Sequence, residues 1–286
     1  MKYSVFTGMT PEYNLAEAAA LFKRLGFDGV EWRVMDVPPE KQGEPPSFWG
    51  SHRCTIPLSQ VEARAAEVRD LTEAAGLEIA ALASYLRPAD LAGAEAVMQG
   101  AAAMGCRLVR FWALPYDGTV PYRELFGKSL AGLVNIEALA RAYDVRAVLE
   151  IHLGYIISSA SLARRLVESF DPRYIGLIYD PGNMVYEGYE AWAMGIEILG
   201  PYLAHVHVKN AGWFPRPRDE DGTTRWEART VPLPDGIVPW GEVLRLLRAA
   251  GYDGYLSLED FSTQQPTAEK LAADLAYLQR LVAALA

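Results

Sequence analysis

Residues 147–152 read Ala147-Val148-Leu149-Glu150-Ile151-His152, a short apolar run that ends in a carboxylate and an imidazole. Three later segments have the same form: they are Ile178-Tyr179-Asp180-Pro181-Gly182-Asn183, His205-Val206-His207-Val208-Lys209-Asn210 and Ser257-Leu258-Glu259-Asp260. Stretches rich in Ala, Leu, Arg and Glu, with apolar residues at helical spacing, separate these runs. Such alternation is typical of a parallel sheet whose strands are joined by crossover helices.

The same pattern extends back to the N-terminus and gives eight predicted strands. They cover Tyr3–Thr7, Gly29–Arg33, Glu78–Ala83, Leu108–Trp112, Ala147–Ile151, Ile175–Tyr179, Ala204–Val208 and Tyr255–Leu258. Helices are predicted over Leu15–Leu25, Val61–Ala75, Leu130–Tyr143, Ser161–Ser169, Trp240–Ala250 and Thr267–Leu285. A chain of 286 residues suits one (β/α)8 barrel better than two small domains. We therefore predict an α/β fold, a TIM barrel formed by a single domain that spans residues 1–286.

Composition narrows the class of protein. The net charge is −9 and no run of Lys or Arg occurs, which argues against a nucleic-acid partner, because clustered cations hold phosphate backbones. The two cysteines, Cys54 and Cys106, lack the spacing of a metal knuckle and indicate free thiols in a reducing compartment. The N-terminus lacks an apolar signal core, and no apolar run approaches the ~20 residues of a membrane span. We expect a cytoplasmic protein that does not contact a membrane.

Two long segments interrupt the alternation of strands and helices. Asp36–Pro57 follows the second predicted strand, and Asn210–Pro239 follows the seventh. Both leave the C-terminal ends of strands, where a barrel builds its active face. Long loops in compact domains are usually functional or disordered, and the aromatic residues of these two favour ordered lids over the active face.

The predicted strands also indicate where a metal site would lie. Four consecutive strands end in Glu150, Asp180, His207 and Glu259, at the end of the barrel that faces the substrate. Three converging carboxylates would repel one another, and the sequence offers no arginine cluster to compensate them. A divalent cation would remove this repulsion, so we predict one metal ion held by these four side chains. Oxygen-rich ligation with one imidazole suits Mn2+ or Mg2+, with Zn2+ and Co2+ as alternatives.

Alternation of side chains along a strand orders the remaining polar residues. Glu150 and His152 share one face of their strand, and His205, His207 and Lys209 share one face of theirs. With His207 at the rim, His205 lies one layer deeper and Lys209 higher. His205 is therefore interpreted as an interior histidine. For Glu31 we expect a buried ion pair with Arg110 or Arg33.

These motifs resemble the sugar phosphate isomerase/epimerase superfamily of xylose isomerase-like TIM barrels, which includes ketose 3-epimerases, hydroxypyruvate isomerase and inosose dehydratase. The resemblance covers nearly the whole chain and also includes Gly26-Phe27-Asp28-Gly29-Val30-Glu31. It implies that Glu150 and Glu259 are the catalytic pair, acting as acid and base from opposite faces of a sugar. It further implies a cis-enediolate, with Asp180 and His207 as metal ligands only.

The resemblance also suggests which residues bind the substrate. His152 matches a substrate contact of the family, and Arg229 stands where ketose epimerases place a substrate-binding arginine, although Asp235 here interrupts the following Pro-Gly turn. Asn183 stands where several relatives have His, which puts strict ketose 3-epimerase activity in doubt. Lys209 could hold a hydroxyl, carboxylate or phosphate, and Trp112 could stack on a sugar.

Four functions remain open from the sequence. The first is a metal-dependent isomerase or epimerase of a small sugar or related hydroxy-carbonyl compound, and the second is a dehydratase of the inosose type. A DNA-repair endonuclease of this superfamily would carry a trinuclear zinc site with many more histidines than the four here. A non-catalytic ligand-binding barrel is the fourth, because fold alone does not establish activity. Members of the superfamily are often homodimers or homotetramers, so we expect one of these states.

Overall fold

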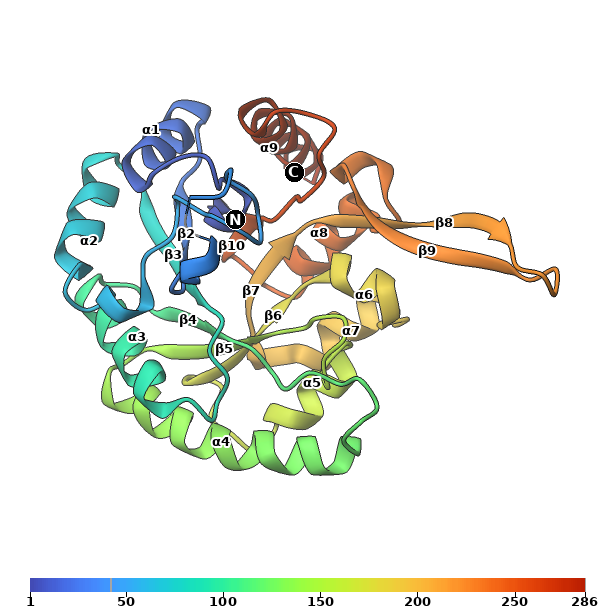
Figure 1. Ribbon diagram of the computed structural model, residues 1–286, viewed down its shortest axis with the longest axis horizontal. Helices are drawn as coiled ribbons and strands as arrows, with labels where there is room; N and C mark the ends of the chain where they lie inside the picture. The colour runs from blue at the N-terminus through green and yellow to red at the C-terminus, as the bar shows by residue number, and fades with distance from the viewer. Residues whose placement is uncertain (42, 286) are drawn as a thin grey trace.

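The barrel is the central feature of the computed structural model, which describes residues 1–41 and 43–285. Eight parallel strands close in the order β1-β10-β7-β6-β5-β4-β3-β2, and helices surround them (Figure 1). The strands are β1 (Lys2–Phe6), β2 (Gly29–Val34), β3 (Glu78–Ser84), β4 (Leu108–Phe111), β5 (Arg146–Glu150), β6 (Ile175–Tyr179), β7 (Leu203–Val208) and β10 (Tyr255–Leu258). The predicted fold class is confirmed, and each predicted strand lies within one residue of the observed bounds at both ends.

The helices are more numerous than the sequence indicates. They are α1 (Leu15–Leu25), α2 (Ala65–Ala74), α3 (Leu91–Ala103), α4 (Tyr122–Ala142), α5 (Ala160–Val167), α6 (Pro181–Glu187), α7 (Trp192–Leu199), α8 (Trp240–Ala249) and α9 (Thr267–Ala283). The prediction missed α3, α6 and α7 and began α4 eight residues late. Among the described residues, no helix is both long enough and apolar enough to cross a bilayer.

Helix ends follow ordinary capping chemistry, as α1 illustrates. The side chain of Asn14 accepts a hydrogen bond from the backbone of Glu17, and the carboxylate of Glu17 accepts one from the backbone of Asn14. This capping box satisfies two amides that the helix leaves free. Gly26 ends the helix at a φ of 96°, in the left-handed region that favours glycine. The chain then enters β2 at the bottom of the barrel.

The segment after β7 differs from the lid that the sequence suggests. Its two strands, β8 (Asn210–Arg218) and β9 (Thr224–Val231), form an antiparallel hairpin. Figure 1 shows this hairpin extending away from the barrel, with only its base near the mouth. The expectation of a lid over the active face is therefore wrong for most of this segment.

The segment after β2 does approach the mouth. Phe48 and Trp49 pack on Phe261, with ring centroids 5.2 and 5.0 Å apart. Phe261 follows β10 by three residues, so this contact joins the segment to the loop after β10, which is separated from β2 in the closed sheet only by β1. One wall of the mouth is therefore aromatic.

Candidate metal centre

Four buried side chains from neighbouring strands converge at the C-terminal end of the barrel. Nδ1 of His207 lies 3.4 Å from Oε1 of Glu150, 3.4 Å from Oε2 of Glu259 and 3.7 Å from Oδ2 of Asp180. Each of the four residues is at most 3% exposed. The structure thus brings together the four residues that the strand ends single out, with one candidate ligand atom from each.

Three of these atoms lack the partner that a buried polar atom normally has. Nδ1 of His207, Oδ2 of Asp180 and Oε2 of Glu259 make no hydrogen bond within the described part of the chain. Lys209 forms ion pairs with Oδ2 of Asp180 and Oε2 of Glu259, but neither contact has the geometry of a hydrogen bond. An unsatisfied buried polar atom costs roughly 1–3 kcal/mol, so a group of three in one place indicates that a ligand completes it. The donor set fits a divalent cation.

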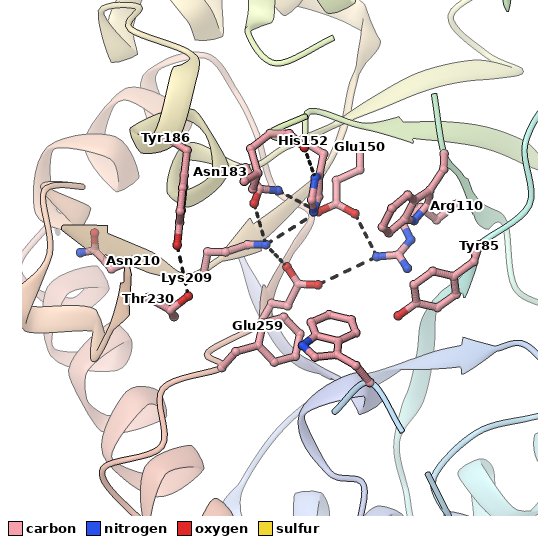
Figure 2. A pocket seen from close by; sticks show the side chains of 14 residues that line it. Tyr85, Arg110, Glu150, His152, Asn183, Tyr186, Lys209, Asn210, Thr230 and Glu259 are labelled. Carbon is pink, nitrogen blue, oxygen red and sulfur yellow. Dashed lines mark hydrogen bonds and ion pairs between the residues drawn. The ribbon is translucent and has the colours of Figure 1, made fainter. Parts of the chain in front are cut away.

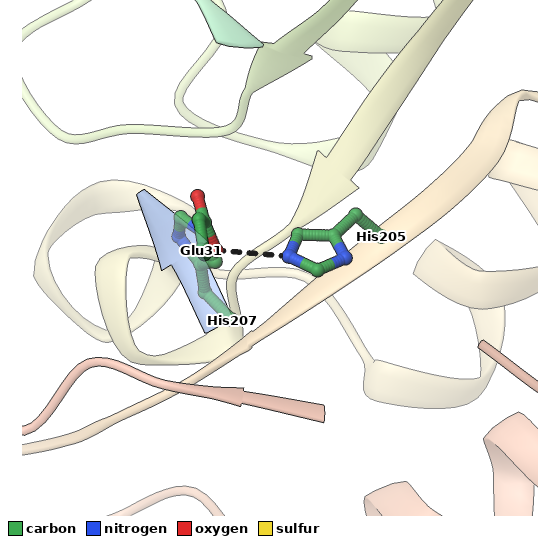
Figure 3. A group of neighbouring side chains, drawn as sticks. All are labelled: Glu31, His205 and His207. Carbon is green, nitrogen blue, oxygen red and sulfur yellow. Dashed lines mark hydrogen bonds and ion pairs between the residues drawn. The ribbon is translucent and has the colours of Figure 1, made fainter. Parts of the chain in front are cut away.

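The opposite side of His207 is fixed by Glu31, one layer deeper in the barrel. Nε2 of His207 lies 3.1 Å from Oε1 of Glu31, and Nε2 of His205 lies 3.0 Å from Oε2 (Figure 3). Ser257 donates to the same carboxylate at 2.7 Å. A carboxylate can only accept, so Nε2 of His207 carries a proton, and Nδ1 is the nitrogen that faces the convergent oxygens and is available to an ion. The expected pairing of Glu31 with Arg110 or Arg33 is wrong, because these imidazoles lie closer to it.

Arg110 and Lys209 correct a second expectation, that no cation compensates the carboxylates. Nη1 of Arg110 donates to Oε2 of Glu150 at 2.9 Å, and Lys209 lies 2.9 Å from Oδ2 of Asp180. Burial alone would lower the pKa of either cation, but the neighbouring carboxylates raise both above their usual values. Both side chains therefore stay charged.

A charge count still leaves a deficit. The four carboxylates carry four negative charges, namely those of Glu31, Glu150, Asp180 and Glu259. Lys209 and Arg110 supply two positive charges, so with neutral imidazoles the group is two charges negative, which one divalent ion would balance. Burial alone would lower the pKa of His207, but the carboxylates of Glu31, Glu259 and Glu150 raise it well above its usual value. An ion bound at Nδ1 would therefore replace a proton.

The two glutamates each divide their oxygens between two neighbours. Oε1 of Glu150 and Oε2 of Glu259 face His207, at 3.4 Å each. Their other oxygens face Nη1 of Arg110, at 2.9 Å for Glu150 and 3.9 Å for Glu259. One oxygen of each glutamate therefore remains outside the candidate ligand set, on the side of the adjoining cavity.

Asn183 and α6 hold this arrangement in place. Asp180 caps α6 by accepting a hydrogen bond from the backbone of Asn183 at 2.8 Å, which uses Oδ1 and leaves Oδ2 for the convergent group. The side chain of Asn183 donates to Oε1 of Glu150 at 3.0 Å and accepts from Lys209 at 3.2 Å. A Cβ at Gly182 would collide with the side chain of Lys209, so glycine permits this close approach.

A cavity of about 170 Å3 opens beside the two glutamates (Figure 2). Four of the five predicted substrate contacts line it, namely Trp112, His152, Asn183 and Lys209. Arg229 does not: its side chain is 56% exposed on the hairpin and donates to Glu227 at 2.8 Å. Its neighbour Thr230 lines the cavity instead, because alternation along β9 turns Arg229 outward.

Several lining residues were missed by sequence reasoning. They include Tyr85, Arg110, Tyr186, Asn210, Thr230 and Phe261. Tyr85 directly follows β3, and Arg110 is the penultimate residue of β4, so the strand-end rule that found the carboxylates could have found both. Thr230 and Tyr186 carry no such signal, since they lie on the unpredicted hairpin and the unpredicted α6.

Comparison with known proteins agrees with this geometry. The family model described as "Xylose isomerase-like TIM barrel" matches residues 19–281. Inosose dehydratase from Clostridium perfringens is 28% identical over 157 residues, which is half of each chain, so the chain spans about half the length of the curated relatives it matches.

Several solved structures share the fold. The 3-keto-D-glucoside 4-epimerase YcjR from E. coli has a TM-score of 0.74 at 18% identity and covers 98% of this chain and 99% of its own. IolI, solved with a bound zinc atom, has a TM-score of 0.71 at 19% identity and covers 100% of this chain and 98% of its own.

Proposed function

The chain belongs to the family of xylose isomerase-like TIM barrels, and on this premise we propose that it is a divalent-metal-dependent isomerase or epimerase. Its substrate would be a small sugar or a related hydroxy-carbonyl compound. The observation that carries the proposal is the divided role of the two glutamates. Each directs one oxygen to the candidate metal centre and the other toward Arg110 at the cavity.

The chemistry that follows is transfer of one proton. One glutamate would take a proton from the carbon beside the substrate's carbonyl group, and the electron pair of that C–H bond would pass into an enediolate. The other glutamate would return a proton to a different carbon or to the opposite face. Asn183 orients Glu150 for this step through the hydrogen bond of 3.0 Å.

The metal would be held by Glu150, Asp180, His207 and Glu259. When bound, a divalent ion supplies Lewis acidity that polarises the carbonyl and favours loss of the adjacent proton. The donor set leaves its identity open among Mn2+, Mg2+, Zn2+ and Co2+, and IolI was solved with zinc. In the same proposal, Trp112 and His152 form one wall against the substrate, with ring centroids 5.1 Å apart.

Deuterium exchange tests this function directly. The Mn2+-loaded protein would be incubated in D2O with a panel of neutral ketoses and hydroxy-keto acids, and C–H exchange would be followed by NMR. We expect exchange at a carbon beside the carbonyl, and its loss in Glu150→Gln and Glu259→Gln. Arg229→Ala is the matched control, because Arg229 lies on the outward face of the hairpin. A panel without exchange, or exchange that survives both glutamine variants, would contradict the proposal.

A dehydratase is the second candidate, and the inosose dehydratase relatives favour it. It would begin with the same proton abstraction but would then expel a hydroxyl group as water. The conjugated carbonyl product absorbs in the ultraviolet, whereas an isomerised sugar does not. Growth of that absorbance with myo-inosose, together with loss of one water by mass, would favour the dehydratase.

A further inference from the structure

We propose that the substrate carries one carboxylate group and that Arg110 binds it. This inference rests on the proposed function, because it concerns the substrate of the same cavity. Arg110 reaches from β4 toward the space between Glu150 and Glu259, with Tyr85 beside it (Figure 2). No sequence motif assigns Arg110 this role, and the expected partner, Glu31, is occupied elsewhere.

The guanidinium group of Arg110 is held in a fixed position. It lies 4.8 Å from the ring centroid of Tyr85, 5.0 Å from that of Phe6 and 5.8 Å from that of Trp112. Nε donates to the backbone carbonyl of Ser84 at 3.3 Å, and Nη1 donates to Glu150. A planar cation so oriented is suited to recognise a planar anion, since little entropy is lost on binding.

One part of this group has no partner. Nη2 of Arg110 is buried and makes no hydrogen bond with any described residue. A buried donor on a charged group is costly to leave unpaired, and a substrate atom in the cavity would satisfy it. The geometry therefore points to an acceptor on the substrate near Tyr85, at the end of the cavity opposite Tyr186 and Thr230 (Figure 2).

Local charge specifies what kind of acceptor fits. With one divalent ion in place, the carboxylates of the metal centre are balanced by that ion, Lys209 and Arg110. A further cation, Arg33, lies 5.4 Å from the ring centroid of the same Tyr85 and is 3% exposed. Arg33 donates to Thr55, and its Nε has no partner; it forms no ion pair within the described ranges. Among these named groups, Arg33 would therefore carry the one positive charge that no carboxylate balances, and a monoanion would neutralise it.

A carboxylate matches this charge better than a phosphate ester does. A phosphate monoester carries roughly 1.5–2 negative charges at neutral pH and offers three acceptor oxygens. Next to Glu150, the second negative charge would meet repulsion, and a single unpaired guanidinium nitrogen cannot satisfy three oxygens. The substrate class is therefore a hydroxy-keto acid or a keto sugar acid.

Matched pairs of ligands test this inference by calorimetry on the Mn2+-loaded protein. Hydroxypyruvate and dihydroxyacetone differ only in a carboxylate against a hydroxymethyl group, as do D-fructuronate and D-fructose. We expect each acid to bind about ten-fold or more tightly than its neutral partner. In Arg110→Met this preference should fall to within about three-fold, and Arg110→Lys should retain part of it. Arg229→Met, which removes an exposed arginine, should leave it unchanged.

Three binding results would overturn the inference, and a fourth comes from the exchange experiment. The first is equal affinity of the wild type for acid and neutral ligand, or no measurable binding of either acid. This result is obtained with the wild type alone, so it does not depend on how a variant folds. The second is a preference that survives in folded, metal-loaded Arg110→Met, which would assign the carboxylate to the ion or to Lys209. The third is tighter binding of dihydroxyacetone phosphate than of hydroxypyruvate. Exchange with neutral ketoses alone would contradict this inference and leave the proposed function standing. Tight binding of the acids without any exchange would support this inference and contradict the proposed function.

Discussion

Replacement of Glu31 by Gln should weaken metal binding although Glu31 is not one of the four candidate ligands. The carboxylate of Glu31 accepts from Nε2 of His207 and Nε2 of His205 and from Ser257, at distances between 2.7 and 3.1 Å. Glutamine has nearly the same volume but presents an NH2 group, which meets protonated imidazole nitrogens. His207 can relieve this conflict by moving its proton to Nδ1, and that proton would occupy the lone pair that faces the metal.

The expected size of the effect follows from these contacts. A hydrogen bond to a charged group contributes about 1.5–3 kcal/mol, and every 1.4 kcal/mol changes a dissociation constant by about ten-fold. Loss of the bond from His207 therefore predicts a dissociation constant raised about 10- to 100-fold, as is usual when a partner of a ligating histidine is removed.

Titration calorimetry of the metal-stripped protein with Mn2+ measures this change. Ser257→Ala is the matched control, because it removes one donor to Glu31 but leaves the carboxylate and the tautomer of His207 intact. We expect this control to bind within about three-fold of the wild type. Equal affinities of folded Glu31→Gln and the wild type would refute the role of Glu31 in fixing His207.

Three further outcomes are expected. Burial and the neighbouring Asp260 raise the pKa of Asp274 to about 8, so the folded protein keeps a proton that the unfolded chain loses above about pH 4. The free energy of unfolding should therefore fall as the pH rises from about 4 to about 8. Asp274→Asn should melt at a higher temperature than the wild type at pH 8 but not at pH 4. A difference in melting temperature that is independent of pH would contradict this. Asn183→Ala should lower the exchange rate about ten-fold or more, because Oε1 of Glu150 loses its donor, whereas Arg229→Ala should change it less than about two-fold. Equal effects of the two substitutions would contradict the role of the Asn183 hydrogen bond. Chelation should lower the melting temperature by about 5 °C or more relative to protein held at 100 times the metal dissociation constant, since such saturation adds about 2.7 kcal/mol; unchanged melting curves would count against a bound ion.

The sequence predicts the barrel and the convergent carboxylates for one physical reason. Strands buried on both faces read as short apolar runs, and a polar residue that ends such a run must face the mouth. Glu150, Asp180, His207 and Glu259 all satisfy this rule, and the closed order of the strands brings them together. For these residues, the local sequence pattern and the strand order of the closed barrel therefore both predict a position at the mouth.

The hairpin and the partners of Glu31 could not be predicted in this way. Strands β8 and β9 are mostly exposed and carry Pro215, Pro217 and four arginines, so no apolar alternation marks them. Glu31 lies more than 170 residues from His205 along the chain. Whether Glu31 pairs with the imidazoles or with Arg110 depends on the layer of the barrel that each side chain reaches. Strand order and stagger decide that layer, and both are properties of the closed sheet.

Anomalous diffraction from crystals grown with Mn2+ tests the central claim most directly, namely that one divalent ion lies among Glu150, Asp180, His207 and Glu259. We predict one anomalous peak per chain within coordination distance of Nδ1 of His207 and one oxygen of each carboxylate, and no such peak in the variant His207→Ala. Crystals at saturating Mn2+ with no peak between these side chains, or with Lys209 occupying the position instead, would contradict it.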